Sequence, residues 1–277
     1  MTDAGSVVVR RQLGRELRTW RERARRTLDD VAAAQIASVS KVQRIDHGRT
    51  SVRPGDVREL CRLYGVGHDT TETLADLARA TRDPDWWERH DTSAPSWFAL
   101  YLSLEAVASD LCAFEPAVIH GLFQTQDYAR EAERGSALDG DAEQVERYVL
   151  TRVMRQRHAF DRPDPLRVRL VLGEASLLTR VGSADVMAAQ RNHLRDLARR
   201  AHLGLRVLPL TAGLHPGLRG SFSLLAFPDP DDPPVAYVET YEAAHYPESP
   251  AQVARFRRRF EQIWALSIPV EEHLRER

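Results

Sequence analysis

The stretch TLDDVAAAQIASVSKVQRIDHGR, residues 27–49, decides the fold of the beginning of this chain. Apolar residues at helical spacing predict two short helices with a shared buried side, the first over about residues 28–34. Ser38 suits the N-cap of the second helix, because its hydroxyl can accept a hydrogen bond from an unpaired backbone N–H. Gly48 stands where a residue with a left-handed backbone can end that helix. The pattern therefore predicts two helices that cross over a tight turn.

The outward side of the second helix is polar and rich in hydrogen-bond donors, which suits the base edges and phosphates of DNA. We expect base-edge contacts from four residues: Ser38, Val39, Ser40 and Arg44. Val39 fits a thymine methyl group, and Arg44 can pair with guanine through two hydrogen bonds. We expect contacts to the DNA backbone from five more residues: Lys41, Gln43, Arg49, Arg53 and Arg15. Paired half-sites are usual for so small a DNA-binding domain, so we expect a homodimer on double-stranded DNA.

The run from Ser38 to Arg49 resembles the recognition helix and following turn of XRE-type helix-turn-helix proteins, the phage-repressor-like group. The matching residues are Ser38, Ser40, Val42, Arg44, Ile45, Asp46, Gly48 and Arg49, preceded by Val31 and Ala32. The turn departs from this family, which usually has an apolar residue followed by glycine where this chain has Gln35 and Ile36. Because Ile is poorly suited to a positive φ, either the turn has a different geometry or Ile36 is the apolar residue of a turn one residue shorter. An ordinary helical hairpin is the competing interpretation.

Three more helices complete a predicted five-helix bundle of the phage-repressor type. The first covers about residues 9–26, and its apolar residues recur along one side. Another begins at Pro54, which suits the first turn of a helix, and the last covers about residues 70–81. An Asp-Pro pair breaks this last helix. We therefore place a helix-turn-helix DNA-binding domain at residues 1–82 and a second domain at residues 83–277.

Charge is unevenly distributed along the chain, although the net charge is only −1. Residues 1–66 hold 14 of the 39 Lys and Arg residues but only 8 of the 40 Asp and Glu residues. A basic first part and an acidic remainder are typical of a DNA-binding domain joined to a domain with another role.

Cysteine usage and hydropathy indicate the compartment. Cys61 and Cys112 lack metal-ligand spacing, and we interpret both as buried free thiols in apolar helical surroundings, consistent with a reducing cytosol. The sequence shows no signal peptide and no apolar run of transmembrane length. We expect a soluble cytoplasmic protein with no metal, cofactor or membrane contact.

Aromatic residues are concentrated between residues 86 and 123, although they make up only 7% of the chain. The cluster contains Trp86, Trp87, Trp97, Phe98, Tyr101, Phe114 and Phe123. Such a cluster most often builds a core or a subunit interface, and it can also form a ligand-binding cage. The candidates for contact with a partner or ligand are Trp97, Tyr101 and Phe123, together with His215 from a later loop.

Residues 101–130 resemble the second domain of a large actinobacterial group of XRE regulators, the WhiJ-like or Scr antitoxin-like kind. The matching residues are Tyr101, Leu104, Glu105, Ala108, Phe114, Glu115, Pro116, Gly121, Leu122, Gln124, Thr125, Tyr128, Ala129 and Arg130. The resemblance continues to about residue 266 and so covers nearly the whole chain. It implies a DNA-binding regulator, and members of this group commonly accompany a small protein encoded beside them.

The second half predicts a mixed α/β domain, which makes the chain α+β as a whole. Four short runs predict a small sheet of about four or more strands: residues 168–172, 205–208, 221–227 and 235–239. Helices are expected over about residues 96–109, 184–202 and 250–266, with an extended segment and a further helix after the first of them.

Catalysis by this domain would have to come from Glu174, His193, His215 and Glu239. No two of them stand at metal-ligand spacing, and the chain has no nucleophile elbow, phosphate loop or dinucleotide fingerprint. His215 is better explained as part of a turn between two strands. We therefore do not expect an enzyme.

The sequence is compatible with three functions. We favour a sequence-specific DNA-binding transcriptional regulator whose second domain receives a protein or ligand signal. The first alternative is an antitoxin-like protein that binds and controls a small partner encoded nearby and uses DNA binding for autoregulation. The second alternative is a metabolite-responsive regulator with its ligand between the aromatic helices and the sheet.

Overall fold

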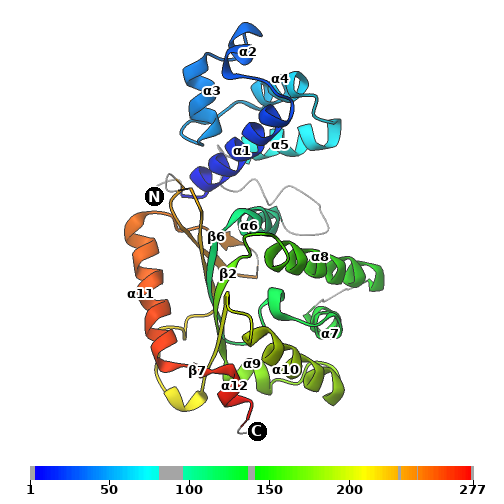
Figure 1. The fold of residues 1–277 in the computed structure, drawn as a ribbon, viewed down its shortest axis with the longest axis vertical. Coiled ribbons are helices and arrows are strands. Elements are labelled where there is room, and N and C mark those ends of the chain that lie inside the picture. Colours follow the sequence, from blue (N-terminus) through cyan, green and yellow to red (C-terminus); the bar gives the residue numbers. More distant parts are fainter. Residues whose placement is uncertain (1–3, 81–95, 137–140, 230–231, 242, 276–277) are drawn as a thin grey trace. The chain divides into compact units, whose positions relative to one another are not determined.

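The computed structural model describes residues 4–80, 96–136, 141–229, 232–241 and 243–275 (Figure 1). The chain divides into two compact units, Met1–Ser103 and Leu104–Arg277. The predicted domain boundary after residue 82 lies outside the described residues, as do Trp86 and Trp87.

Residues 4–80 of the first unit form the five predicted helices: α1 (Ala4–Arg23), α2 (Leu28–Ala33), α3 (Val39–Asp46), α4 (Pro54–Tyr64) and α5 (His68–Ala80). α1 begins at Ala4, which is earlier than the predicted start at residue 9. α4 has Pro54 in its first turn, and Gly65 ends it with a φ of +73°. The five helices share one apolar core, which includes Leu17, Val31, Val42, Leu60 and Leu74.

A close contact between the backbones of α1 and α3 sets how these helices cross. A Cβ atom on Gly14 of α1 would lie 2.2 Å from the carbonyl oxygen of Ile45 on α3. Gly48, with a φ of +63°, lies just after α3, and a Cβ atom there would lie 2.5 Å from the α1 backbone. The Arg21 guanidinium of α1 also donates to the Asp46 carboxylate of α3 at 2.8 Å. Two glycines therefore allow the approach, and a buried ion pair holds the end of α3 on α1.

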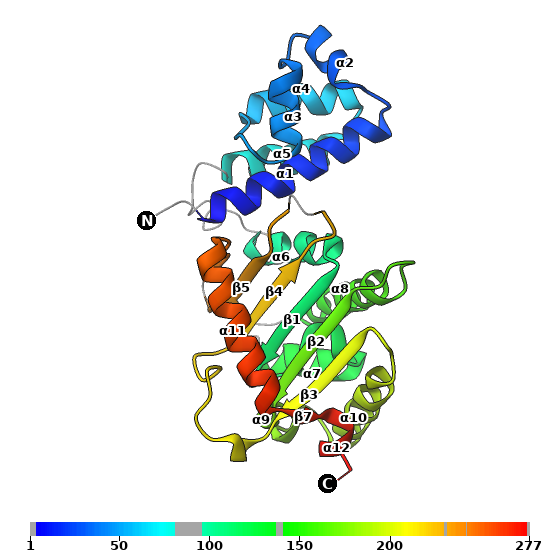
Figure 2. The same cartoon turned by 60° about the vertical axis from the view of Figure 1, so that its left-hand side comes forward.

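The second unit is built on a seven-stranded mixed sheet with the order β6-β5-β4-β1-β2-β3-β7 (Figure 2). The strands are β1 (Asp110–Glu115), β2 (Arg167–Gly173), β3 (Leu203–Leu208), β4 (Phe222–Ala226), β5 (Val235–Glu239), β6 (Ala244–His245) and β7 (Ile268–Pro269). β1, β2 and β3 are parallel, whereas β4 is antiparallel to β1 and β5 is antiparallel to β4. The four predicted strands are β2 to β5, so the expected sheet of about four or more strands is confirmed.

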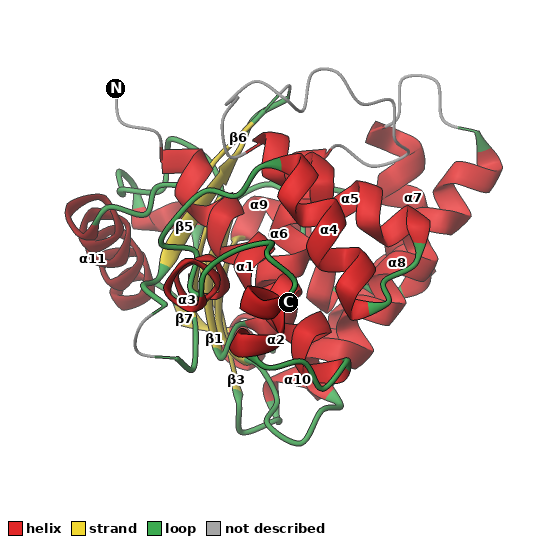
Figure 3. Ribbon diagram, turned by 90° about the horizontal axis from the view of Figure 1, so that it is seen from above, coloured by secondary structure: helices red, strands yellow, loops and turns green. Residues whose placement is uncertain are grey.

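Helices cover both faces of this sheet (Figure 3). α7 (Gln126–Ser136), α8 (Ala142–Phe160) and α10 (Ala184–Ala198) belong to the connections between the parallel strands and lie on one face. α11 (Pro250–Leu266), which has its predicted bounds, lies on the other face. Its residues Val253, Phe260 and Ile263 share an apolar cluster with residues of β1 to β5. The remaining elements are α6 (Ser96–Val107), η2 (Gly121–Phe123), α9 (Glu174–Leu178), η3 (Leu210–Ala212) and α12 (Val270–His273).

The central strand β1 was not predicted. We expected a helix to about residue 109, but α6 ends at Val107 and β1 begins at Asp110. The run DLCAFE is short, and it becomes a strand because β2 and β4 pair with it on both sides. Cys112 consequently lies half-buried on a strand and not among helices, whereas Cys61 is buried in α4 as expected. Burial raises the pKa of the Cys112 thiol to about 11.

Between β1 and α7 the chain makes a buried turn, η2, whose backbone pairs with glutamine side chains. Gln190 of α10 donates to a carbonyl oxygen of this turn and accepts from a backbone N–H just after it, both at 2.7 Å. Gln156 of α8 donates to two carbonyl oxygens of the same segment, at 3.1 and 2.8 Å. These bonds satisfy backbone groups that are shielded from water, and they join the turn to both helices.

His120 caps η2 and is itself buried. Its Nδ1 accepts from the Leu122 N–H at 3.3 Å, and only 6% of the residue is exposed. Arg155 of α8 donates to both oxygens of the Glu105 carboxylate, at 3.0 and 2.9 Å. Burial lowers the pKa of His120 to about 4; the charge of Glu105 opposes this shift, whereas Arg155 and Arg152 add to it.

The glycine contact predicts the effect of a single methyl group. Gly14→Ala should lower the free energy of opening of the first unit by about 1–3 kcal/mol, because the added Cβ atom meets a backbone carbonyl. Native-state hydrogen exchange of peptides from α1 and α3, in the full chain, measures this energy. The matched control is Gly55→Ala, since a Cβ atom at Gly55 has no heavy atom within 4 Å. An equal loss of opening free energy in both variants would contradict the close contact between the backbones of α1 and α3.

The buried histidine predicts a loss of stability in acid. The pKa of His120 is about 4 in the folded chain and about 6.5 when unfolded, so the unfolded chain binds the proton first. The contribution of neutral His120 to the free energy of unfolding should therefore be complete above about pH 6.5 and should decrease as the pH falls towards 4. Between about pH 7 and pH 5, the wild type should lose about 2 kcal/mol more than His120→Asn, which keeps a capping acceptor. Chemical unfolding at both pH values measures this difference. Equal losses of stability in the wild type and in His120→Asn would contradict the lowered pKa of His120.

Candidate nucleic-acid interface

The turn between α2 and α3 keeps a compact geometry because Gln35 takes the left-handed conformation. Gln35 has a φ of +58°, and Ile36 packs against the apolar core of the first unit. Of the two interpretations of this turn, the structure supports the one in which Ile36 is the apolar residue. Thr27 begins α2 with a capping box, in which its hydroxyl accepts from the Asp30 N–H and the Asp30 carboxylate accepts from the Thr27 N–H. Ser38 caps α3 as predicted and accepts from the Lys41 N–H at 3.3 Å.

α3 exposes the four residues that we predict to contact bases. Ser38, Val39, Ser40 and Arg44 are exposed, whereas Val42 and Ile45 are buried in the core. These four side chains come from the beginning and the outer side of one helix. Side chains at the beginning of a helix can reach the base edges of the major groove.

The predicted backbone contacts differ in their surroundings. Gln43, Arg49 and Arg53 are exposed, and Arg53 occupies the N-cap position of α4. Lys41 is half-buried, and its Nζ lies 2.9 Å from the Asp56 carboxylate. Arg15 is half-buried on α1. All five remain predicted phosphate contacts, but Lys41 already has a carboxylate partner.

Asp46 is the one acidic residue of α3, and it points away from the exposed surface. The Arg21 guanidinium donates to its carboxylate through Nη2 and Nε, at 2.8 and 3.2 Å. Burial raises the pKa of Asp46, and Arg21 opposes that rise. The outer side of α3 therefore presents no carboxylate to DNA. It continues beyond the predicted residues to the exposed His47, whose Nδ1 lies 2.7 Å from the Gln43 carbonyl oxygen.

The predicted partner or ligand residues of the second domain do not share one surface. Tyr101 and Phe123 are buried, at 2% and 0% exposure. Both rings pack inside the protein, so neither is exposed to a partner. Trp97 lies in α6, and its side chain is outside the described part of the chain. His215 is half-buried, with its ring edge-on to Phe114 at 5.8 Å. Its Nδ1 accepts from the Gly217 N–H at 3.1 Å, which fits the predicted turn.

The residues considered for catalysis are placed in separate structural roles. The buried Glu174 carboxylate accepts from the Leu210 N–H at 2.7 Å and so fixes the chain after β3. Glu239 ends β5, and its charge adds to the burial that raises the pKa of Glu115 to about 8. His193 lies on α10, half-buried. Within the described residues, no three His, Cys, Asp or Glu side chains are grouped to hold a metal ion, and no helix is long and apolar enough to cross a membrane.

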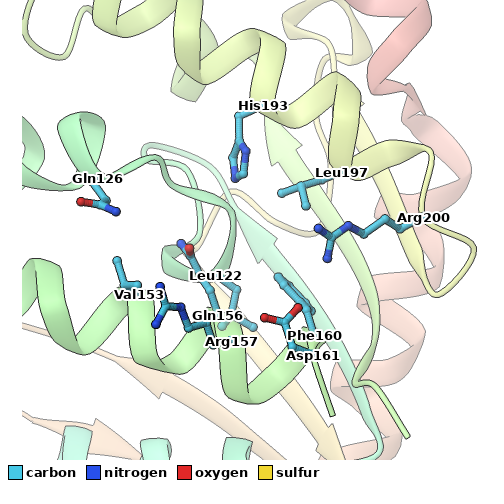
Figure 4. A pocket seen from close by; sticks show the side chains of 10 residues that line it. All are labelled: Leu122, Gln126, Val153, Gln156, Arg157, Phe160, Asp161, His193, Leu197 and Arg200. Atoms are coloured by element: carbon cyan, nitrogen blue, oxygen red, sulfur yellow. The ribbon is translucent and has the colours of Figure 1, made fainter. Parts of the chain in front are cut away.

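A pocket that sequence reasoning did not identify opens between α8 and α10 (Figure 4). His193 and Leu197 point from α10 towards α8, where Gln156 and Phe160 face them. Its residues come from three separate parts of the chain, so no local motif in the sequence marks it.

The left-handed turn residue predicts a stabilising substitution. Gln35→Gly should raise the free energy of opening of α2 and α3 by about 0.5–1 kcal/mol, because glycine adopts a φ of +58° without steric cost. Hydrogen exchange of peptides covering residues 28–46 measures this energy. Ala34→Gly is the matched control, since Ala34 has a φ of −73° and gains nothing from glycine. A loss of stability in Gln35→Gly would contradict the strained turn.

Comparison with protein families assigns both parts of the chain. Residues 12–74 match the family model of a helix-turn-helix domain, which covers α2, the turn and α3. Residues 98–275 match the model of DUF5753, a domain of unknown function. No curated protein and no solved structure matches the chain. The second match covers more than half of the 277 residues, so the chain belongs to the DUF5753 family and carries a helix-turn-helix domain before its DUF5753 domain.

Proposed function

We propose that this protein is a sequence-specific transcriptional regulator that inserts α3 into the major groove of double-stranded DNA. The observation that carries the proposal is the orientation of α3. Its outer side exposes Ser38, Val39, Ser40 and Arg44, while its one carboxylate, Asp46, is buried against Arg21. An exposed carboxylate at this place would repel phosphates, whereas the exposed hydroxyl and guanidinium groups can donate to base edges.

The DUF5753 domain, in this proposal, receives a signal and binds rather than catalyses. A homodimer that contacts two half-sites fits the small size of the helix-turn-helix domain. As a DNA-binding regulator the protein would work in the cytoplasm. Membership of the actinobacterial WhiJ-like group, and binding of a small protein encoded nearby, are finer predictions from the resemblance.

The role of Arg44 can be tested by substitution. Arg44→Ala should weaken binding to DNA from the region upstream of the gene by about 1–3 kcal/mol and relax the preference over scrambled DNA, because a bidentate contact to guanine is lost. A titration in a salt series measures affinity on both DNAs, and log affinity should fall linearly with log salt.

Arg62→Ala is the matched control, since Arg62 is exposed on α4 of the same unit and is not among the predicted DNA contacts. This variant should keep the preference of the wild type. Equal losses on specific and scrambled DNA in Arg44→Ala would exclude base contact by Arg44. Absence of any preference in the wild type would exclude sequence-specific binding. Adding the protein encoded beside this gene to the same titration tests control by a partner.

A further inference from the structure

The pocket between α8 and α10 has a volume of about 180 Å³. This is below the roughly 300–1,000 Å³ that is usual for drug-sized ligands, so the pocket suits a small metabolite and not a peptide or a helix. Figure 4 shows that α10 and the turn after it form one wall and that α8 forms the other. All lining residues belong to the second unit.

Two guanidinium groups give this pocket a positive charge. Of the four arginines on α8, Arg147, Arg152 and Arg155 form ion pairs with carboxylates, whereas Arg157 pairs with no described side chain. Arg157 lines the pocket, as does Arg200, which also has no described ion pair. Asp161 is the one carboxylate among the lining residues. The lining therefore carries one excess positive charge when histidine is neutral.

The rest of the lining is apolar apart from three uncharged polar residues, Gln126, Gln156 and His193. Leu122, Phe160 and Leu197 are buried and supply apolar surface. The Gln156 amide nitrogen donates hydrogen bonds to the backbone of the η2 segment, which holds this segment at the base of the pocket. Burial lowers the pKa of His193, and the nearby Arg200 adds to this shift. A neutral imidazole can donate one hydrogen bond and accept another.

We infer that this pocket binds a small monocarboxylate with an apolar body. A guanidinium group donates two parallel hydrogen bonds to a carboxylate, and the apolar body covers the buried side chains of the lining. Asp161 balances only one of the two arginines, so an anionic ligand balances the remaining charge and an uncharged ligand does not.

The pocket also has a direct structural link to α6. α8 lines the pocket through Arg157 and Phe160, and it binds α6 through the buried ion pair of Arg155 with Glu105. The Arg155 guanidinium lies on the η2 turn, 3.2 Å from where a Cβ atom of Gly121 would be. α6 follows residues 81–95 in the chain, after the helix-turn-helix domain. The idea that this ligand is the regulatory signal rests on the proposed function. The idea that the pocket binds the ligand is independent of it.

The test is a binding titration of the full chain with benzoate, and with benzamide as a neutral probe of the same shape. Benzoate should bind at least about tenfold more tightly than benzamide, because charge-assisted hydrogen bonds are roughly twice as strong as neutral ones. The double variant Arg157→Gln/Arg200→Gln should lose at least about tenfold in benzoate affinity. All four arginines are exposed, and the matched control is Arg147→Gln/Arg199→Gln, which removes the same charge from the same two regions at residues that do not line the pocket.

Equal binding of benzoate and benzamide would overturn the inference, as would equal losses in the two double variants. Absence of benzoate binding at any concentration up to about 20 mM would also overturn it. The titration contains no DNA, so its outcome is independent of the DNA experiment. If the protein binds benzoate but shows no preference for any DNA, the ligand site is supported and the proposed function as a regulator is excluded.

Discussion

The second unit depends on pairing the backbone of a buried turn. The η2 segment runs beneath α8 and α10, where water cannot satisfy its N–H and carbonyl groups, and an unpaired buried group costs about 1–3 kcal/mol. Gln190 and Gln156 supply the missing partners from the two helices. These bonds join α8 and α10 to the same segment. Leu122 of this turn lines the pocket between the two helices.

In the first unit the corresponding constraint is steric. Gly14 lets α1 touch the backbone of α3, and Arg21 then holds Asp46 on the inner side of that contact. Because α3 is fixed at its end, its outer side is determined by the core residues Val42 and Ile45. The same packing that stabilises this unit thus decides which side chains are available to DNA.

The two units have different chemistry, which supports a division of roles. The exposed side of α3 offers donors without a carboxylate, as a surface that binds a polyanion requires. The pocket of the DUF5753 domain combines apolar area with two guanidinium groups in a volume of about 180 Å³. The surface of α3 suits a polymer, whereas the pocket suits a small molecule.

The sequence by itself determined the helix-turn-helix and several helix starts, because caps and turns act within a few residues. Ser38 and Pro54 marked helix starts in the sequence and do so in the structure. It also determined four strands, whose apolar runs are long enough to identify. Only the tertiary structure decided that residues 110–115 are the central strand, because pairing with β2 and β4 outweighs a weak local preference. The inward turn of Asp46 and the pocket at Arg157 and Arg200 were likewise decided by contacts between residues distant in the chain.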